Sequence, residues 1–250
     1  DKLMAEFADE LDNLGVRVAK LEKKSDNVKI TGQIRFADWS YDKNPGDADN
    51  IRTRLFLNGA INDDWTYTAM LENTQNLRTN AENDETATKM RRAYVTGDLG
   101  SGVKVVAGRQ AVKIGRGFVI DSPMGDSVRV MAGKALKVDA FGGRFAPSQG
   151  ADQKDSTYGV GLDYKFDKNL YMDASYFNTE NYTDRDIYTV GVGYKFDKNV
   201  DLYAQYLKSD EETNGDDDGY VVALRYKGAK ASKADSWGTY VNYYDQAATT

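Results

Sequence analysis

The sequence contains no cysteine and no histidine among its 250 residues. These absences exclude a disulfide framework, a cysteine-based zinc site and every catalytic mechanism that relies on an imidazole. Prolines number only 3, and no run of apolar residues is long enough for a transmembrane helix. We therefore expect no metal, no cofactor and no enzymatic activity.

Basic residues are also in deficit, with 33 Lys and Arg against 39 Asp and Glu. Phosphate binding needs a basic face, so the net charge of −6 argues against a nucleic-acid partner. What the chain does have is 17 tyrosines and 23 glycines. Together with the scarcity of proline, this composition favours extensive β-sheet.

Residues 1–26 are predicted to form a helical stalk. Its apolar positions are spaced by 3, 4, 3, 4 and 3 residues, as in the seam of a heptad repeat. Gly15 costs about 1 kcal/mol relative to alanine, so the helix should need partners. We expect a self-associating coiled coil; the alternative is an amphipathic helix docked on its own domain. The seam consists of Met4, Phe7, Leu11, Leu14, Val18 and Leu21.

From residue 27 onward the hydrophobic period changes to two, which indicates strands. The segment Tyr-Lys-Phe-Asp-Lys-Asn occurs at 164–169 and again at 194–199, as one strand–turn–strand unit used twice. Thirteen strands are expected, at roughly 28–41, 50–61, 64–76, 88–98, 103–111, 127–132, 135–145, 156–166, 169–179, 186–196, 199–208, 219–227 and 236–245.

The connections between these strands alternate in length. Odd-numbered ones are mostly long and polar, such as 77–87, 146–155 and 209–218, whereas even-numbered ones are mostly short, such as 62–63, 167–168 and 197–198. Short turns at one end and long loops at the other are typical of an outer-membrane barrel. The predicted fold class is therefore all-β, with residues 27–250 forming a transmembrane antiparallel β-barrel.

Such barrels usually have an even number of strands. Strand thirteen would end outside the cell, so we expect about 16 strands in the complete barrel, with about three C-terminal strands missing here. Tyr and Phe at strand ends are expected to form aromatic girdles toward lipid. Charged side chains on the opposite, polar faces need water or an oppositely charged partner. The arginines that fall on these polar faces are Arg35, Arg52 and Arg54.

Residues 112–126 are too apolar and Gly-rich for an exterior loop, and we expect them to fold into the lumen. The nearby segments Arg-Leu-Phe-Leu-Asn-Gly at 54–59 and Gly-Arg-Gln at 108–110 resemble general porins. The resemblance implies a basic cluster on the barrel wall, formed by Arg54, Arg109 and Arg129, that faces Asp121 and Asp126 across the pore. Gly115, Arg116 and Gly117 would belong to this constriction loop. A transverse field of this kind selects solutes by size and charge.

Residues 7–36 resemble the junction in the S-layer-homology-bearing outer-membrane porins of diderm Firmicutes. That resemblance implies a homotrimeric barrel in contact with outer-membrane lipid and lipopolysaccharide, and a periplasmic stalk. It also implies a tether to peptidoglycan or its linked polymer, through an N-terminal S-layer-homology domain that this chain lacks.

The function expected from these observations is passive diffusion of small hydrophilic solutes and ions. The main alternative is a structural tether with an incidental or plugged barrel. A soluble β-barrel binder and an outer-membrane enzyme are further alternatives, and the absence of histidine argues against the enzyme. The acidic stretch at 216–218 lacks the downstream Glu of a calcium loop, and we interpret it as solvated.

Overall fold

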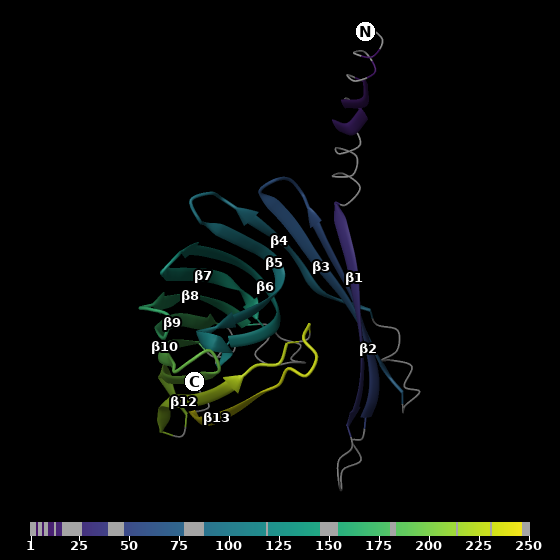
Figure 1. Ribbon diagram of the computed structural model, residues 1–250. Helices are drawn as coiled ribbons and strands as arrows, with labels where there is room; N and C mark the ends of the chain where they lie inside the picture. Colours follow the sequence, from purple (N-terminus) through teal and green to yellow (C-terminus); the bar gives the residue numbers. More distant parts are fainter. Residues whose placement is uncertain are drawn as a thin grey trace. The chain divides into compact units, whose positions relative to one another are not determined.

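The computed structural model describes residues 27–39, 48–77, 88–118, 120–145, 155–180, 184–213, 215–230 and 232–246, with residues 4, 7, 10–12 and 14–16 near the N-terminus. Thirteen strands form one sheet in the order β1 to β13, so each strand lies beside its neighbours in sequence (Figure 1). This confirms the predicted number of strands. No helix in the described part is long and apolar enough to cross a membrane. The chain forms two compact units, Asp1–Val95 and Thr96–Thr250.

In the first unit, antiparallel pairing places Gln33 opposite Arg54 and Arg54 opposite Glu72. The described residues of the N-terminal segment are helical and exposed, including Met4 and Phe7. Val18 and Leu21 of the predicted seam lie outside the described residues. The strands are β1 (Val28–Trp39), β2 (Ala48–Ala60), β3 (Trp65–Asn76) and β4 (Lys89–Asp98).

The second unit contains the end of β4 and all later elements, and its strands pair antiparallel from β5 to β13 wherever a register is given. The elements are β5 (Lys104–Ile114), the short 3₁₀ helix η1 (Gly115–Gly117), β6 (Ile120–Gly133), β7 (Leu136–Phe145), β8 (Asp155–Lys165), β9 (Leu170–Glu180), β10 (Arg185–Lys195), β11 (Val200–Thr213), β12 (Asp216–Lys227) and β13 (Gly238–Gln246).

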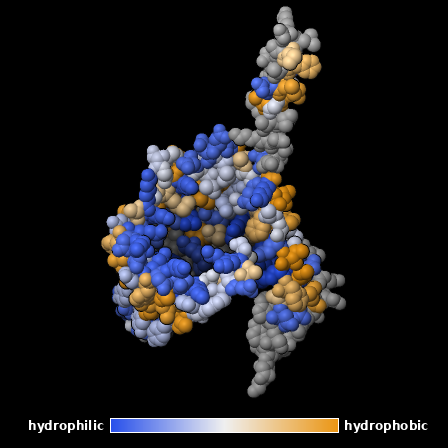
Figure 2. Space-filling view, viewed as in Figure 1, coloured by the Kyte–Doolittle hydropathy of each residue, from blue (hydrophilic) through white to orange (hydrophobic). Residues whose placement is uncertain are grey.

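The polarity of this sheet is the reverse of that in a soluble protein: apolar side chains are exposed on one face, and polar side chains are buried on the other. On β10, Val190 and Val192 are 54% and 52% exposed, whereas Thr189 between β9 and β11 is 2% exposed. Asp173 on β9 is likewise buried. Figure 2 shows hydrophobic side chains along the outer flank of this unit and hydrophilic ones toward its hollow side. We call the face with the buried polar groups the inner face and the apolar one the outer face.

Aromatic side chains form pairs near the strand ends on the outer face. Tyr164 packs edge-on against Phe166 with ring centroids 4.7 Å apart, and Tyr194 packs against Phe196 at 5.2 Å. Near the opposite ends of the strands, Tyr176 lies 5.2 Å from Tyr188. Amphipathic rings at two levels of an apolar band are typical of the two interfaces of a membrane-spanning barrel.

Short turns close one end of the sheet, and an Asn or Asp side chain stabilises several of them. Oδ1 of Asp167 accepts the N–H groups of Asn169 and Leu170, both at 2.7 Å, and Asp197 makes the equivalent bonds 30 residues later. Asn62 does the same between β2 and β3. The predicted turns and the repeated unit are therefore present.

The opposite end differs from the prediction at two connections. The predicted loop 209–218 is instead a hairpin, because β11 continues to Thr213 and β12 begins at Asp216. The predicted loop 112–126 is likewise mostly strand, with β5 and β6 paired out to Ile114 and Ile120. Pairing between the two strands of each hairpin satisfies the backbone N–H and C=O groups of both segments.

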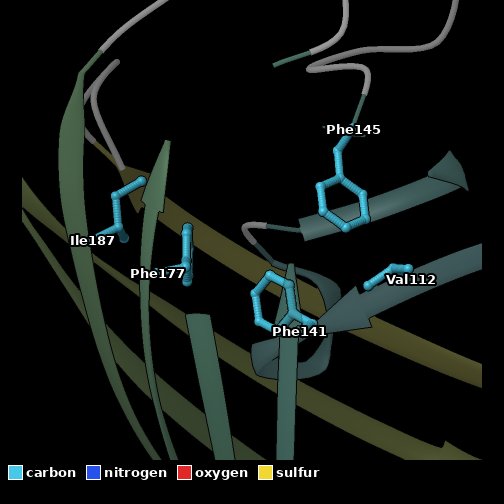
Figure 3. Packing of buried hydrophobic residues seen from close by; sticks show 5 residues of the cluster. All are labelled: Val112, Phe141, Phe145, Phe177 and Ile187. Atoms are coloured by element: carbon cyan, nitrogen blue, oxygen red, sulfur yellow. The ribbon is translucent and has the colours of Figure 1, made fainter. Parts of the chain in front are cut away.

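A small apolar cluster lies on the inner face of the second unit. Val112 from β5 is fully buried against aromatic residues of β7 and β9, and Figure 3 shows the five side chains gathered between the strands. The cluster holds the distal part of β5 against strands that are not its neighbours in the sheet. Its members are Val112, Phe141, Phe145, Phe177 and Ile187.

Candidate functional site

Three arginines converge on one carboxylate in the first unit. Nη2 of Arg54 lies 2.6 Å from Oε2 of Glu72, and Nε of Arg91 lies 2.8 Å from Oε1. Nε of Arg52 is 3.9 Å from the same carboxylate. Arg52 and Arg54 share one face of β2, and Glu72 from β3, which is only 6% exposed, contacts them and Arg91 from β4. We call this set the arginine cluster.

The arginine cluster has an excess of positive charge. One carboxylate opposes three guanidinium groups, and Arg35 lies directly across from Arg52 in the register of β1 and β2. Among the described residues, Nε of Arg52 has no hydrogen-bond partner although it is buried. The arrangement can therefore attract an anion, and it needs water or solute to complete its hydrogen bonds.

In the second unit, the connection between β5 and β6 reaches strands well beyond its neighbours. The guanidinium of Arg116 lies over the rings of Tyr171 and Tyr203, at 4.2 and 4.7 Å from their centroids. Its Nε is 3.4 Å from Oδ2 of Asp173, which is 5% exposed. Phe118 stacks on Tyr203 with centroids 5.9 Å apart. We call residues 115–118 the hairpin tip.

Glycines on β10 make room for the two tyrosines. A Cβ atom at Gly193 would lie 2.1 Å from the Tyr171 ring, and one at Gly191 would lie 2.1 Å from the Tyr203 hydroxyl. Each hydroxyl donates a hydrogen bond to a carboxylate 30 residues away in sequence, Tyr171 to Asp201 and Tyr203 to Asp173. Each copy of the 30-residue repeat thus supplies one tyrosine and one aspartate. The guanidinium of Arg116 lies over the two tyrosine rings.

Charged groups of both signs line the space next to the hairpin tip. Nζ of Lys113 lies 2.6 Å from Oδ2 of Asp121 across the hairpin, and Arg129 forms an ion pair with Asp139 on the neighbouring wall. A cavity of about 210 Å³ lies between these groups, lined in part by Lys113, Arg116, Asp139 and Asp173. Within the described residues, no group of acidic side chains could hold a metal ion.

Arg109 and Asp126 do not fit the expected facing arrangement. They are direct partners on adjacent strands, with Nε of Arg109 2.7 Å from Oδ1 of Asp126. Both alternate with buried Gln110 and Ser127 and so lie on the opposite face from Arg129. Asp126 belongs to β6 rather than to a loop. The expectation that it faces Arg109 across a gap is therefore wrong, because cross-strand pairing joins the two directly.

Glu72, the carboxylate of the arginine cluster, could have been predicted from the sequence. The turn at 61–64 fixes the register of β2 and β3 and so places Glu72 opposite Arg54. Arg91, however, lies on β4, and no short turn between β3 and β4 fixes the register of these two strands. The sequence did not predict the contacts of Arg116 with Asp173, Tyr171 and Tyr203. These contacts depend on the path of the β5–β6 hairpin, which no local sequence pattern encodes.

Comparisons with known proteins agree with the fold. The family model for the outer membrane protein β-barrel domain matches residues 14–196. A substituted variant of the Rhodopseudomonas blastica porin is 17% identical with a TM-score of 0.57, covering 88% of this chain and 86% of that chain. A triple variant of the same porin is 16% identical with a TM-score of 0.57, covering 88% and 85%. No curated protein matches. The chain belongs to the outer membrane protein β-barrel domain family.

Proposed function

We propose that this barrel is a passive diffusion channel for small hydrophilic solutes and ions. The observation that carries the proposal is the inverted polarity of the sheet, in which valines and tyrosines are exposed on the outer face while Glu72 and Asp173 are buried on the inner one. Apolar side chains toward lipid and charges toward a wet interior are the arrangement of a porin. Buried charge of both signs has no use in a barrel filled only for stability.

The hairpin tip is proposed as the constriction. It crosses from β5 to the inner face of β9 and β11, where Arg116 and Phe118 contact the wall. Lys113, Asp121, Arg129 and the cavity beside them would form the polar edge of the opening. The arginine cluster, which includes Arg54 and Arg52, would provide excess positive charge on the wall. A field across a narrow hydrated passage selects by size and charge.

The proposal is tested by reconstituting the purified, detergent-folded protein in planar lipid bilayers. We expect stepwise current increases of uniform size, with larger steps in more concentrated KCl, because the ions move through water. Heat-denatured protein from the same preparation is the control. A folded sample that inserts and yet carries no current at any voltage would reject the function and would favour the alternative of a structural element with a plugged barrel.

The helical segment is proposed as a periplasmic stalk of a homotrimer. Support comes from exposed apolar residues at heptad positions, among which Met4 and Leu11 are 78% and 65% exposed. An exposed apolar seam needs a partner helix. Residues 1–26 would then form the stalk and 27–250 the barrel. The tether to peptidoglycan through an S-layer-homology domain stays a prediction that rests on the sequence resemblance, as does the contact with lipopolysaccharide.

A further inference from the structure

The two ends of the second unit carry opposite charge. Every second connection lies at the same end of an antiparallel sheet, so the connections after β6, β8, β10 and β12 share the end with short turns. The connections after β9 and β11 share the end with loops. We call these two ends the turn rim and the loop rim.

Lysines dominate the turn rim. The stretch 134–137 contains two lysines and no carboxylate, 165–169 and 195–199 contain two lysines and one aspartate each, and 227–235 contains three lysines and one aspartate. All of these lysines are exposed. Lys195 belongs to the inner face, because its Nζ lies 5.7 Å from the centroid of the buried Tyr171 ring. Lys165 holds the equivalent position in the repeat.

Carboxylates dominate the loop rim. The β11–β12 hairpin carries Asp210, Glu211 and Glu212 on one strand and Asp216, Asp217 and Asp218 on the other, with Lys208 as the only basic residue from 208 to 218. Lys208 lies 2.5 Å from Asp217 and so neutralises one of these carboxylates. The preceding connection adds Glu180, Asp184 and Asp186 against Arg185.

We propose that the channel rectifies, passing more current when the loop rim is at the more positive potential than when the turn rim is. The proposal rests on the proposed channel function. Fixed charge at a mouth enriches counter-ions there, so cations accumulate at the loop rim and anions at the turn rim. At the favoured polarity both ions are driven inward from the mouth where they are enriched. At the opposite polarity both are drawn from the depleted side, and the interior loses carriers.

The asymmetry must depend on salt. The Debye length is about 10 Å at 0.1 M and about 3 Å at 1 M ionic strength, so the field of a rim reaches across the mouth only in dilute salt. The ratio of the currents at equal and opposite voltages should therefore exceed one in 0.1 M KCl and approach one in 1 M KCl.

The test is a set of single-channel current–voltage curves in symmetric KCl. Orientation is read from a Ser232→Cys background at the turn rim, because the chain has no other cysteine and a bulky thiol-reactive reagent labels the protein only from the chamber that this rim faces. Replacing four turn-rim lysines with Gln (Lys165, Lys168, Lys195 and Lys198) should lower the ratio in 0.1 M KCl, because anions are then less enriched at the turn rim while the loop rim still enriches cations. The matched control, Lys208→Gln, makes the same substitution at the loop rim and should increase the ratio, because it frees the charge of Asp217.

Each outcome bears on a single claim. A channel that conducts with symmetric curves in 0.1 M KCl overturns the rectification and leaves the channel function intact. A ratio that is unchanged in the fourfold variant, or that falls in Lys208→Gln, also overturns it. Absence of any current would instead reject the channel function. Equal conductance of wild type and variants in 1 M KCl shows that the variants fold.

Discussion

Single side chains stabilise the short turns between the strands of this barrel. Asp167 and Asp197 each accept two backbone N–H groups that the sheet leaves unpaired. The N–H of Leu170 contributes most to a lowered pKa of Asp167, and the N–H of Asn169 adds to it. The N–H of Asn199, followed by that of Val200, lowers the pKa of Asp197 in the same way. The charged form of each carboxylate is therefore the one that stabilises the turn.

This gives a pH dependence with a defined sign. A folded-state pKa below the unfolded one contributes stability that is complete above the unfolded value of about 3.9 and is lost as pH falls through the folded value. The unfolding temperature in detergent should therefore drop below about pH 4. A double Asp167→Asn, Asp197→Asn variant should show a smaller drop, because the amide still accepts the N–H groups but does not titrate, as Asn62 illustrates. Equal drops for wild type and variant would contradict this role of the turns.

Arg116 is the residue whose removal should disturb the hairpin tip most. Its cation–π contacts are each worth about 0.5–2 kcal/mol. Without it, the buried Asp173 keeps, among the described residues, the hydrogen bonds from Tyr203 and Gln205. We expect Arg116→Ala to increase fluctuations of the open-channel current, recorded as current variance at fixed voltage. Arg116→Lys keeps the charge but cannot stack as a plane, so its variance should lie between the two. A variance as low as that of wild type in Arg116→Ala would show that other contacts hold the tip.

At the scale of whole elements, the strands were predictable and the hairpin path was not. Alternation at Val190 and Val192, and the repeated turn at Asp167 and Asp197, are local patterns that fix strands and register. The segment 112–126 shows no such local pattern. Its contact with β9 depends on residues far away in sequence, so its path could not be predicted. Arg109 was placed in the pore by the resemblance to general porins, whereas the burial of the adjacent Gln110 on the inner face puts Arg109 on the outer face.

The arginine cluster makes a prediction about selectivity. Arg91→Gln removes one of the excess positive charges, while Arg54 keeps Glu72 paired. The reversal potential in a KCl gradient should therefore shift toward cation selectivity, with little loss of stability because positions facing the lumen tune selectivity. Arg109→Gln is the matched control and should leave the potential unchanged, since Arg109 lies on the opposite face. A shift in Arg109→Gln with none in Arg91→Gln would reverse this assignment of faces.

For the molecule as a whole, the exposed heptad positions predict association. We expect the detergent-solubilised protein to have the mass of a homotrimer in light scattering. Leu11→Asp, which puts charge into the seam, should weaken the trimer, whereas Glu10→Asp on an adjacent exposed position should not. A monomer in the wild type would reject the stalk as an oligomerisation element, and an unchanged trimer in Leu11→Asp would assign association to the barrel wall alone.

The central claim is that the inner face of the sheet lines a water-filled passage. Because the chain has no cysteine, a single introduced thiol reports its own surroundings. Thr74 on β3 shares the face of Glu72 and is exposed, whereas Leu71 alternates to the outer face. A charged, membrane-impermeant thiol reagent added during recording should reduce the conductance of Thr74→Cys and leave that of Leu71→Cys unchanged. Reaction at Leu71→Cys together with no effect at Thr74→Cys would show that the sheet faces the other way, and would contradict the account.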